Sequence, residues 1–307
     1  MNHKLFKREN WPILIIISIM TSVSMLPFRL QVGIVIFLGF FTKPFLKKRS
    51  VVAKTNFKIV YPQKSEKEID TLVKKSYRSM ILSGIEIAGA WMLTKKRFNK
   101  IEFEWDADSW EIYSKYINTP KQNIVILGCH FHCMELIGRK VATLTPNFTV
   151  MFQPNSNKDL DDLMTSYRER NITKCLSNKN FISVIKSIKR GNPMCYAPDQ
   201  DFGLEPTGLD NSIFVPFFNI PCSTLTVTPW LAQKCNAVVL PMHYVRVKCL
   251  RKYKIFVSEP LKYTGDAYGD ALLGNEYLEK AILGHPEQYL WQHRRFRTRP
   301  NGEPQIY

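Results

Sequence analysis

Acidic residues are scarce in this sequence. Its 307 residues include 26 Asp and Glu against 43 Lys and Arg, a formal charge of +17 at pH 7. It has no internal repeat and no low-complexity tract, which argues against solenoid and disordered proteins. Walker, dinucleotide-binding and nucleophile-elbow patterns are also missing, so the sites that they mark are not expected. The surplus of positive charge predicts an acidic partner, either nucleic acid, an anionic membrane or a phosphorylated substrate.

Cysteine is absent from the first 128 residues, and the total of seven is odd. This pattern excludes a regular disulfide framework and favours reduced thiols in a cytosolic compartment. The cysteines are Cys129, Cys133, Cys175, Cys195, Cys222, Cys235 and Cys249.

Two apolar runs open the chain. Trp11–Met25 contains no charged residue, and with Leu26 it would extend ~24 Å as a helix, slightly less than a bilayer core. A second run, residues 30–41, is too short to span. Basic residues flank the runs: Lys4, Lys7 and Arg8 before them, and Lys43, Lys47, Lys48 and Arg49 after them. We expect a membrane anchor over residues 1–45, single-pass or monotopic, with the remaining chain on the cytoplasmic face. A cleaved signal peptide with Ser22-Val23-Ser24 as its cleavage site and a buried soluble helix are the alternatives.

The rest of the chain predicts an α/β domain with a mostly parallel central sheet flanked by helices. Ser65 and Glu68 have capping-box spacing, and apolar residues at helical spacing predict a helix over residues 66–91. Strands are expected at 124–127, 148–152, 194–197, 238–244 and 254–257. Helices are expected between them at 136–143, 160–170, 181–189 and 224–236, with Gly191 as a C-cap. Alternating strands and helices are typical of parallel sheets, which bind ligands at the carboxyl ends of their strands.

His130 and Glu135 are the strongest catalytic candidates. Their segment follows the expected strand at 124–127, where a strand gives way to a helix. Residues five apart do not share a face of a regular helix, so the two side chains meet only if His130 is on the loop and Glu135 in the first helical turn. The carboxylate would then orient the imidazole, which would take a proton from a hydroxyl. His132 and Glu135 are alternative partners at helical spacing, and a capped helix start with one satisfied histidine is the structural alternative.

Other motifs suggest further chemistry. Two cysteines and two histidines at residues 129–133 invite a zinc interpretation, but no second ligand pair follows, so no metal is expected there. Asp199 and Asp201 form an Asp-x-Asp pair that would hold a divalent cation in a glycosyltransferase, or cap a turn. Arg168 and Arg170 end an expected helix. Arg294 and Arg295 begin a basic, aromatic-rich cluster that suits single-stranded nucleic acid, lipid phosphates or a solvated tail.

Several blocks in order resemble the lipid A biosynthesis acyltransferase family, within the wider lysophospholipid-acyltransferase-like group, over nearly the whole chain. The matching residues are Asn56; Tyr77-Arg78; residues 86–91; His130-Phe131-His132-Cys133-Met134-Glu135; Pro154-Asn155; Arg168-Glu169-Arg170; residues 196–203, which read YAPDQDFG; residues 214–218, which read FVPFF; residues 286–289; and residues 293–300. Gln200 replaces a usual histidine, and Ser177-Asn178-Lys179 replaces a usual Asp-Arg-Lys. Substrate detail therefore stays open.

The resemblance implies a donor and an acceptor. The donor is an acyl-acyl carrier protein, and the acceptor is a hydroxyl on a 3-hydroxyacyl chain of a Kdo-bearing, tetra-acylated, bisphosphorylated lipid A precursor. It implies no cofactor, and the motif ending in Glu favours the lauroyl-transferase branch. The expected partners are these two substrates and inner-membrane phospholipid, without nucleic acid. Residues 46–307 would form the acyltransferase domain.

In the expected mechanism, His130 is the general base and Glu135 orients it. Arg168, Arg170, Asp199, Asp201, Arg294 and Arg295 would contact substrate. Two other functions remain open: a membrane-anchored protein that binds anionic lipid or nucleic acid without catalysis, and a metal-dependent glycosyltransferase using Asp199 and Asp201.

Overall fold

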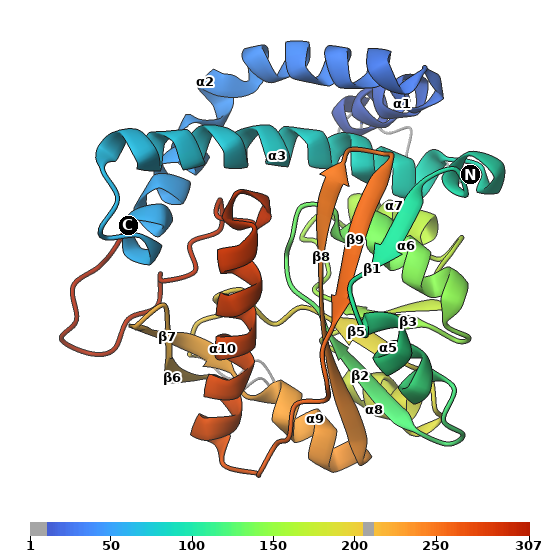
Figure 1. Cartoon of the computed structure of the whole chain (residues 1–307), viewed down its shortest axis with the longest axis vertical. Helices are drawn as coiled ribbons and strands as arrows, with labels where there is room; N and C mark the ends of the chain where they lie inside the picture. Colours follow the sequence, from blue (N-terminus) through green and yellow to red (C-terminus); the bar gives the residue numbers. More distant parts are fainter. Residues whose placement is uncertain (1–10, 205–211) are drawn as a thin grey trace.

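A seven-stranded sheet with helices on both faces forms the body of the molecule, and three N-terminal helices lie across one end of it (Figure 1). The structure is a computed structural model that describes residues 11–204 and 212–307. The predicted basic flank at Lys4, Lys7 and Arg8 lies outside the described residues.

The strands are short and mostly parallel. Their bounds are β1 Glu102–Trp105, β2 Asn123–Leu127, β3 Thr149–Phe152, β4 Lys174–Ser177, β5 Met194–Tyr196, β8 Ala237–Lys248 and β9 Lys252–Val257. Their order is β1-β9-β8-β2-β5-β3-β4. Among these neighbouring strands, only β8 and β9 pair in antiparallel orientation, and the other pairs are parallel. The predicted mostly parallel sheet is therefore confirmed. A separate antiparallel pair, β6 Ser212–Phe217 and β7 Ile220–Leu225, lies beside α10.

Both faces of β2 are buried, which explains its unbroken apolar sequence. Ile124 and Ile126 face one core, and Val125 and Leu127 face the other. The first core includes side chains from α3 Glu66–Met92, α5 Ser109–Ile117, α6 Met134–Leu144 and α10 Ala267–Gly284. The second is covered by α8 Phe181–Lys189 and α9 Val227–Cys235. This part of the chain also contains α4 Lys95–Phe98, α7 Lys158–Arg168 and the 3₁₀ helix η3 Pro286–Gln288.

Local sequence signals predicted many of these boundaries. The capping box at Ser65 and Glu68 opens α3 as expected, and Gly191 adopts a positive φ of 79° just after α8. The expected helix over 224–236 starts too early, because Thr224 and Leu225 belong to β7. Thr224 and Leu225 pair with β6 instead, and a helical spacing of apolar residues cannot predict such a long-range strand pairing.

The N-terminal apolar segment forms two helices. α1 covers Trp11–Met25, and Pro27 separates it from α2, which runs over Phe28–Val60. Within residues 11–204 and 212–307, no helix is long and apolar enough to cross a bilayer, so the predicted single-pass anchor is not confirmed.

Candidate active site

The predicted placement of His130 and Glu135 is confirmed. β2 ends at Leu127 and α6 begins at Met134, so His130 lies on the connecting loop and Glu135 in the first turn of α6. The loop begins at Gly128, where an added Cβ would stand 3.4 Å from the carbonyl oxygen of a residue in β5. A glycine therefore lets the loop leave β2 close beside its neighbouring strand.

The imidazole of His130 is held by Asp199. Nδ1 of His130 lies 2.6 Å from Oδ1 of Asp199, and the backbone N–H of His130 donates to Oδ2 at 2.9 Å. The Asp199 side chain is fully buried, whereas 22% of the His130 side chain is exposed. The two residues meet because β5 pairs directly with β2, which brings the carboxyl ends of the two strands together.

Charge in this pair is strongly coupled. Burial raises the pKa of Asp199, but the charge and hydrogen bonds of His130 outweigh it and bring that pKa to about 2. Burial lowers the pKa of His130, and the charge and hydrogen bond of Asp199 outweigh it, so this pKa lies above its usual value. An ionised Asp199 accepts the Nδ1–H of the imidazole. The lone pair of the neutral ring is therefore on Nε2, the nitrogen that a substrate can use.

Glu135 has different partners. Trp91 Nε1 donates to Oε2 at 3.1 Å, and Arg168 Nε lies 3.0 and 3.2 Å from the two carboxylate oxygens. Arg168 Nη2 also pairs with Oε1. This geometry corrects the expectation that Glu135 orients His130: Asp199 occupies Nδ1, and the Glu135 carboxylate is bound by Arg168 and Trp91.

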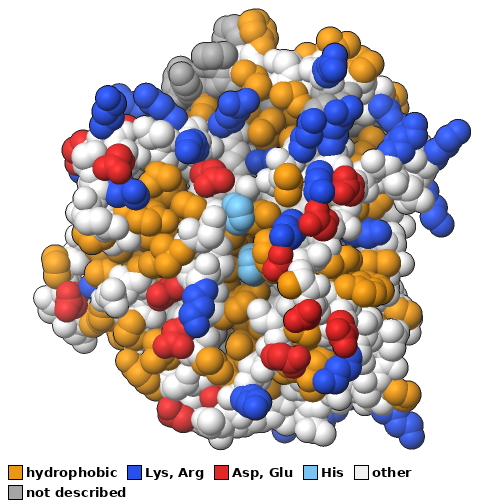
Figure 2. Space-filling model, viewed as in Figure 1, with side chains coloured by type: hydrophobic (Ala, Val, Ile, Leu, Met, Phe, Trp, Pro, Cys, Tyr) orange, Lys and Arg blue, Asp and Glu red, His pale blue; other side chains and the backbone are white. Residues whose placement is uncertain are grey.

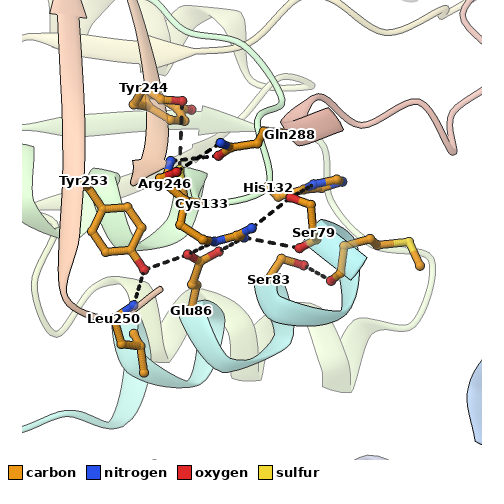
Figure 3. Close-up of polar contacts among 11 residues, drawn as sticks. Ser79, Ser83, Glu86, His132, Cys133, Tyr244, Arg246, Leu250, Tyr253 and Gln288 are labelled. Carbon is orange, nitrogen blue, oxygen red and sulfur yellow. Dashed lines mark hydrogen bonds and ion pairs between the residues drawn. The ribbon is translucent and has the colours of Figure 1, made fainter. Parts of the chain in front are cut away.

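His132 belongs to a buried network behind the loop (Figure 3). Its Nδ1 lies 2.8 Å from the hydroxyl of Ser79, which also accepts from Arg246 Nη1 at 2.8 Å. Arg246 forms an ion pair with Glu86, whose carboxylate accepts from Tyr253 as well. Burial, together with the positive charge of Arg246, lowers the pKa of His132 to about 3. His132 is therefore neutral and does not pair with Glu135.

A cavity of about 460 Å³ opens beside His130, Glu135 and Arg168. Residues of β3, α6 and α7 line it. Phe152 and Gln153 line it at the carboxyl end of β3, and Phe148 lines it just before the strand begins. Four residues of strand correspond to about 13 Å. Apolar side chains dominate the lining between these points: Met134, Ile137, Val141, Val150, Met164 and Ile172. The imidazole of His130 thus lies at a cavity whose lining is mainly apolar.

The other predicted site residues are dispersed. Arg170 is exposed, with its guanidinium 4.2 Å from the ring centre of Tyr167, and Arg294 is exposed near Tyr307. Arg295 is buried and donates to the carbonyl of Ser223 at 2.6 Å. The expected substrate contact by Arg295 is thereby corrected to an internal one.

Asp201 is also internal, and its carboxylate binds the backbone N–H and the hydroxyl of Thr298 at 2.7 and 2.8 Å. In the described parts of the chain, no three His, Cys, Asp or Glu side chains gather in a way that suits a metal ion. Asp199 and Asp201 each bind protein donors instead, which leaves the Asp-x-Asp metal interpretation without support from their geometry.

The role of Asp199 was missed because the partner strand is not evident from the sequence. β5 is three strands later than β2 in chain order, yet lies beside it in the sheet. The one available signal was an aspartate directly after a buried strand, at the edge where ligands bind. Arg246 was not singled out, since a lone charged residue carries no signature, and Glu86 and Tyr289 entered only as members of blocks that resemble the family.

Comparison with known proteins identifies the family. Residues 2–298 match the family model described as bacterial lipid A biosynthesis acyltransferase. The palmitoleoyltransferase of lipid A biosynthesis from Escherichia coli K12 is 30% identical over 273 residues, covering 88% of this chain and 86% of that protein. The lipid A biosynthesis lauroyltransferase of the same organism is 30% identical over 297 residues, covering 95% and 93%.

A solved structure, the 1-acyl-sn-glycerophosphate (LPA) acyltransferase PlsC from Thermotoga maritima, aligns with a TM-score of 0.37 at 14% identity, covering 81% of this chain and 94% of that one. The family match and the two relatives carry the assignment. The chain belongs to the bacterial lipid A biosynthesis acyltransferase family, and it is an acyltransferase of late lipid A biosynthesis.

Proposed function

We propose that this enzyme transfers a fatty acyl chain from an acyl carrier protein thioester to the hydroxyl of a 3-hydroxyacyl chain. The acceptor would be a Kdo-bearing, tetra-acylated lipid A precursor. The observation that carries the proposal is the His130–Asp199 pair, in which His130 lines a largely apolar cavity. A base beside such a cavity suits a reaction that joins a hydroxyl to a long acyl chain.

In this mechanism His130 is the general base and Asp199 orients it. Nε2 of His130 takes the proton of the acceptor hydroxyl as its oxygen attacks the thioester carbonyl carbon. The tetrahedral intermediate collapses, the C–S bond breaks, and the imidazolium returns the proton to the departing thiolate. Asp199 stabilises the transient imidazolium, a contribution that is lost together with the correct tautomer when such a carboxylate is removed.

Arg168 is the proposed donor to the oxyanion, and Glu135 is proposed to hold it. Arg168 lines the cavity, and its side chain is 15% exposed. Two-point pairing with Glu135 fixes the guanidinium in one orientation, which favours a preorganised donor over a mobile one. The remaining Arg168 N–H groups would face the charge that develops on the thioester oxygen.

The cavity beneath α6 and α7 is the proposed acyl site. Its apolar lining lets a hydrocarbon chain leave water, at roughly 0.8 kcal/mol per methylene. The two relatives at equal identity are a palmitoleoyl- and a lauroyltransferase by name, so the acyl length of this enzyme is open between at least those classes. The depth of the cavity would decide it.

The surface suits acidic substrates at a membrane. Figure 2 shows Lys and Arg side chains gathered over the upper part of this face, and apolar side chains among them. On α1 and α2 the exposed apolar residues include Trp11, Ile15, Ile19, Met25 and Leu30. We propose that these helices lie in the interface of the inner membrane on its cytoplasmic side. Basic residues such as Arg170 and Arg294 would contact the acceptor's phosphates and the acidic carrier.

Mass spectrometry of the reaction product tests the function. Purified enzyme is incubated with the lipid A precursor and a panel of acyl carrier protein thioesters of different chain length. The expected product is heavier by one acyl group, with wild-type protein and not with His130→Ala, and it forms equally in excess EDTA. No mass increase with any thioester would reject the proposed function. Loss of activity in EDTA, restored by a divalent cation, would revive the metal-dependent alternative at Asp199 and Asp201.

A further inference from the structure

The C-terminal segment 288–298, called the brace below, binds the loop that carries Asp199. The buried carboxylate of Asp201 accepts three hydrogen bonds: two from Thr298, at 2.7 and 2.8 Å, and one from Gly203, at 2.9 Å. The backbone N–H of Asp201 donates to Nε2 of His293 at 2.9 Å. Asp201 is therefore tied on both its backbone and its side chain to two points of the brace, two residues after Asp199.

The same segment binds the loop that carries His130. Leu290 N–H donates to the carbonyl of His130 at 3.0 Å, and His132 N–H donates to the carbonyl of Gln288 at 2.9 Å. Phe131 and Tyr289 form an antiparallel bridge between these bonds. The Tyr289 hydroxyl also donates to the backbone carbonyl of Asp199 at 3.3 Å. One short segment thus touches both members of the pair on their backbones.

The brace is itself anchored from the opposite side. The amide of Asn56, a fully buried residue of α2, donates to the carbonyls of Trp291 at 2.8 Å and His293 at 2.9 Å. Arg49 donates to the carbonyl of Gln292 at 3.1 Å. Burial holds the pKa of His293 near 4, so its Nε2 accepts the Asp201 N–H throughout the neutral range. The brace therefore has fixed partners on α2 as well as at the site.

We propose that Asp201, His293 and Thr298 are positioning residues, which hold Asp199 against His130 through the brace. The inference rests on the proposed role of His130 as the base. Both His130 and Asp199 follow strand ends and lie on loops, and loops hold side chains less rigidly than helices or strands. Catalytic geometry must be kept within about 0.5 Å, so two loops need an element that fixes one against the other. The brace serves that purpose here, and its buried Arg295 donates to the carbonyl of Ser223 rather than facing the cavity.

Asp201→Asn is the main test. The substitution keeps the shape of the side chain but replaces one acceptor oxygen with a donor amide that faces the donors of Thr298. We expect kcat to fall about 10- to 100-fold with KM for both substrates nearly unchanged, the range of a misplaced catalytic group. We also expect the acidic limb of the kcat/KM–pH profile to move to lower pH, because a displaced Asp199 no longer stabilises protonated His130.

Asp270→Asn is the matched control. Asp270 on α10 is similarly buried, and its carboxylate also binds two groups of a threonine and one glycine N–H: Thr264 N at 2.8 Å, Thr264 Oγ1 at 3.2 Å and Gly265 N at 2.9 Å. The same chemical change there should lower thermal stability without moving the acidic limb. Thr298→Val is a milder variant of the brace, because it removes only the hydroxyl donor and keeps the backbone bond. It should shift the limb in the same direction by a smaller amount.

The outcomes separate the brace from the proposed function. Suppose that His130→Ala is inactive, while Asp201→Asn and Thr298→Val fold and keep the wild-type kcat and acidic limb. The positioning role of the brace is then refuted, and the role of His130 as the base is retained. If Asp201→Asn does not fold, the acidic limb of the kcat/KM–pH profile of Thr298→Val is the test. A wild-type limb in Thr298→Val then refutes the positioning role of the brace. If His130→Ala retains full activity, both the role of His130 as the base and the positioning role of the brace are refuted. A loss of kcat together with a shifted limb in both variants, absent from Asp270→Asn, supports the brace.

Discussion

Oδ1 of Asp199 lies 2.6 Å from Nδ1 of His130 although 69 positions separate the two residues in the chain. This contact assigns the nitrogen Nε2 to the substrate side. It also separates the two carboxylates near the histidine, since Asp199 binds the imidazole and Glu135 binds Arg168.

Asp199→Asn should lower kcat by about 10²- to 10⁴-fold, because the amide stabilises neither the imidazolium nor the correct tautomer. The raised pKa of His130 makes activity fall as the pH drops through that pKa. Without the carboxylate, this pKa should fall, so the acidic limb moves to lower pH while the plateau is lower. Steady-state rates from pH 5 to 9 measure both effects. An unchanged limb would mean that another group controls it.

Glu135→Gln should reduce kcat through Arg168 and leave the acidic limb where it is. The neutral amide keeps an acceptor for one donor but loses the two-point ion pair, which frees the guanidinium. We expect a loss of at least about 10-fold, and a larger loss, about 10²-fold, for Glu135→Ala. The same pH series gives the answer. A limb that shifts as in Asp199→Asn would place Glu135 on the imidazole after all.

His130→Ala should lower transfer by at least about 10²-fold, whereas His132→Ala should be mild in the folded enzyme. His132 is neutral and buried against Ser79, so its loss acts on stability, by about 1 to 3 kcal/mol for a buried hydrogen-bonded group. Because the folded-state pKa of His132 is depressed to about 3, its contribution is present above pH 6.5 and is lost as the pH falls toward 3. Thermal unfolding of both variants at pH 7 and pH 4.5 tests this. If His132→Ala were inactive and His130→Ala had normal activity, the base would have to be His132 and not His130.

Gly138→Leu should favour shorter acyl thioesters. Gly138 lines the cavity between Ile137 and Val141, and an added Cβ there meets nothing within 4 Å. A leucine side chain would fill part of the acyl site. We expect the preference between a long and a short thioester to change by about 10-fold or more, as for other size-selective apolar pockets. Gly84→Leu, another helical glycine with open space but outside the cavity lining, is the matched control. The same preference in both variants would show that the acyl chain lies elsewhere.

Replacing Ile15 and Ile19 with glutamate should release the protein from membranes, while 1 M salt alone should not. Both side chains are about half exposed on α1, and apolar insertion is insensitive to ionic strength. Charge contacts with the acceptor and carrier are screened, since the Debye length is already about 8 Å at physiological ionic strength, so KM for both should rise with salt. Ile182→Glu, at an even more exposed isoleucine on α8, is the control. Fractionation and kinetics across a salt series measure these effects, and release by salt alone would refute apolar anchoring.

The sequence by itself determined the α/β class, the loop-to-helix position of His130 and Glu135, and the family. These features depend on local properties: the unbroken apolar run of β2, the spacing of the motif and the capping box of α3. Only the tertiary structure decided which carboxylate meets the imidazole. Pairing of β5 with β2 is a non-local choice, and nothing near Asp199 in the chain specifies which strand will lie beside it. The same holds for Arg295 and Asp201. Their charges suggested substrate contact, and their burial against Ser223 and Thr298 follows from how the C-terminal segment packs.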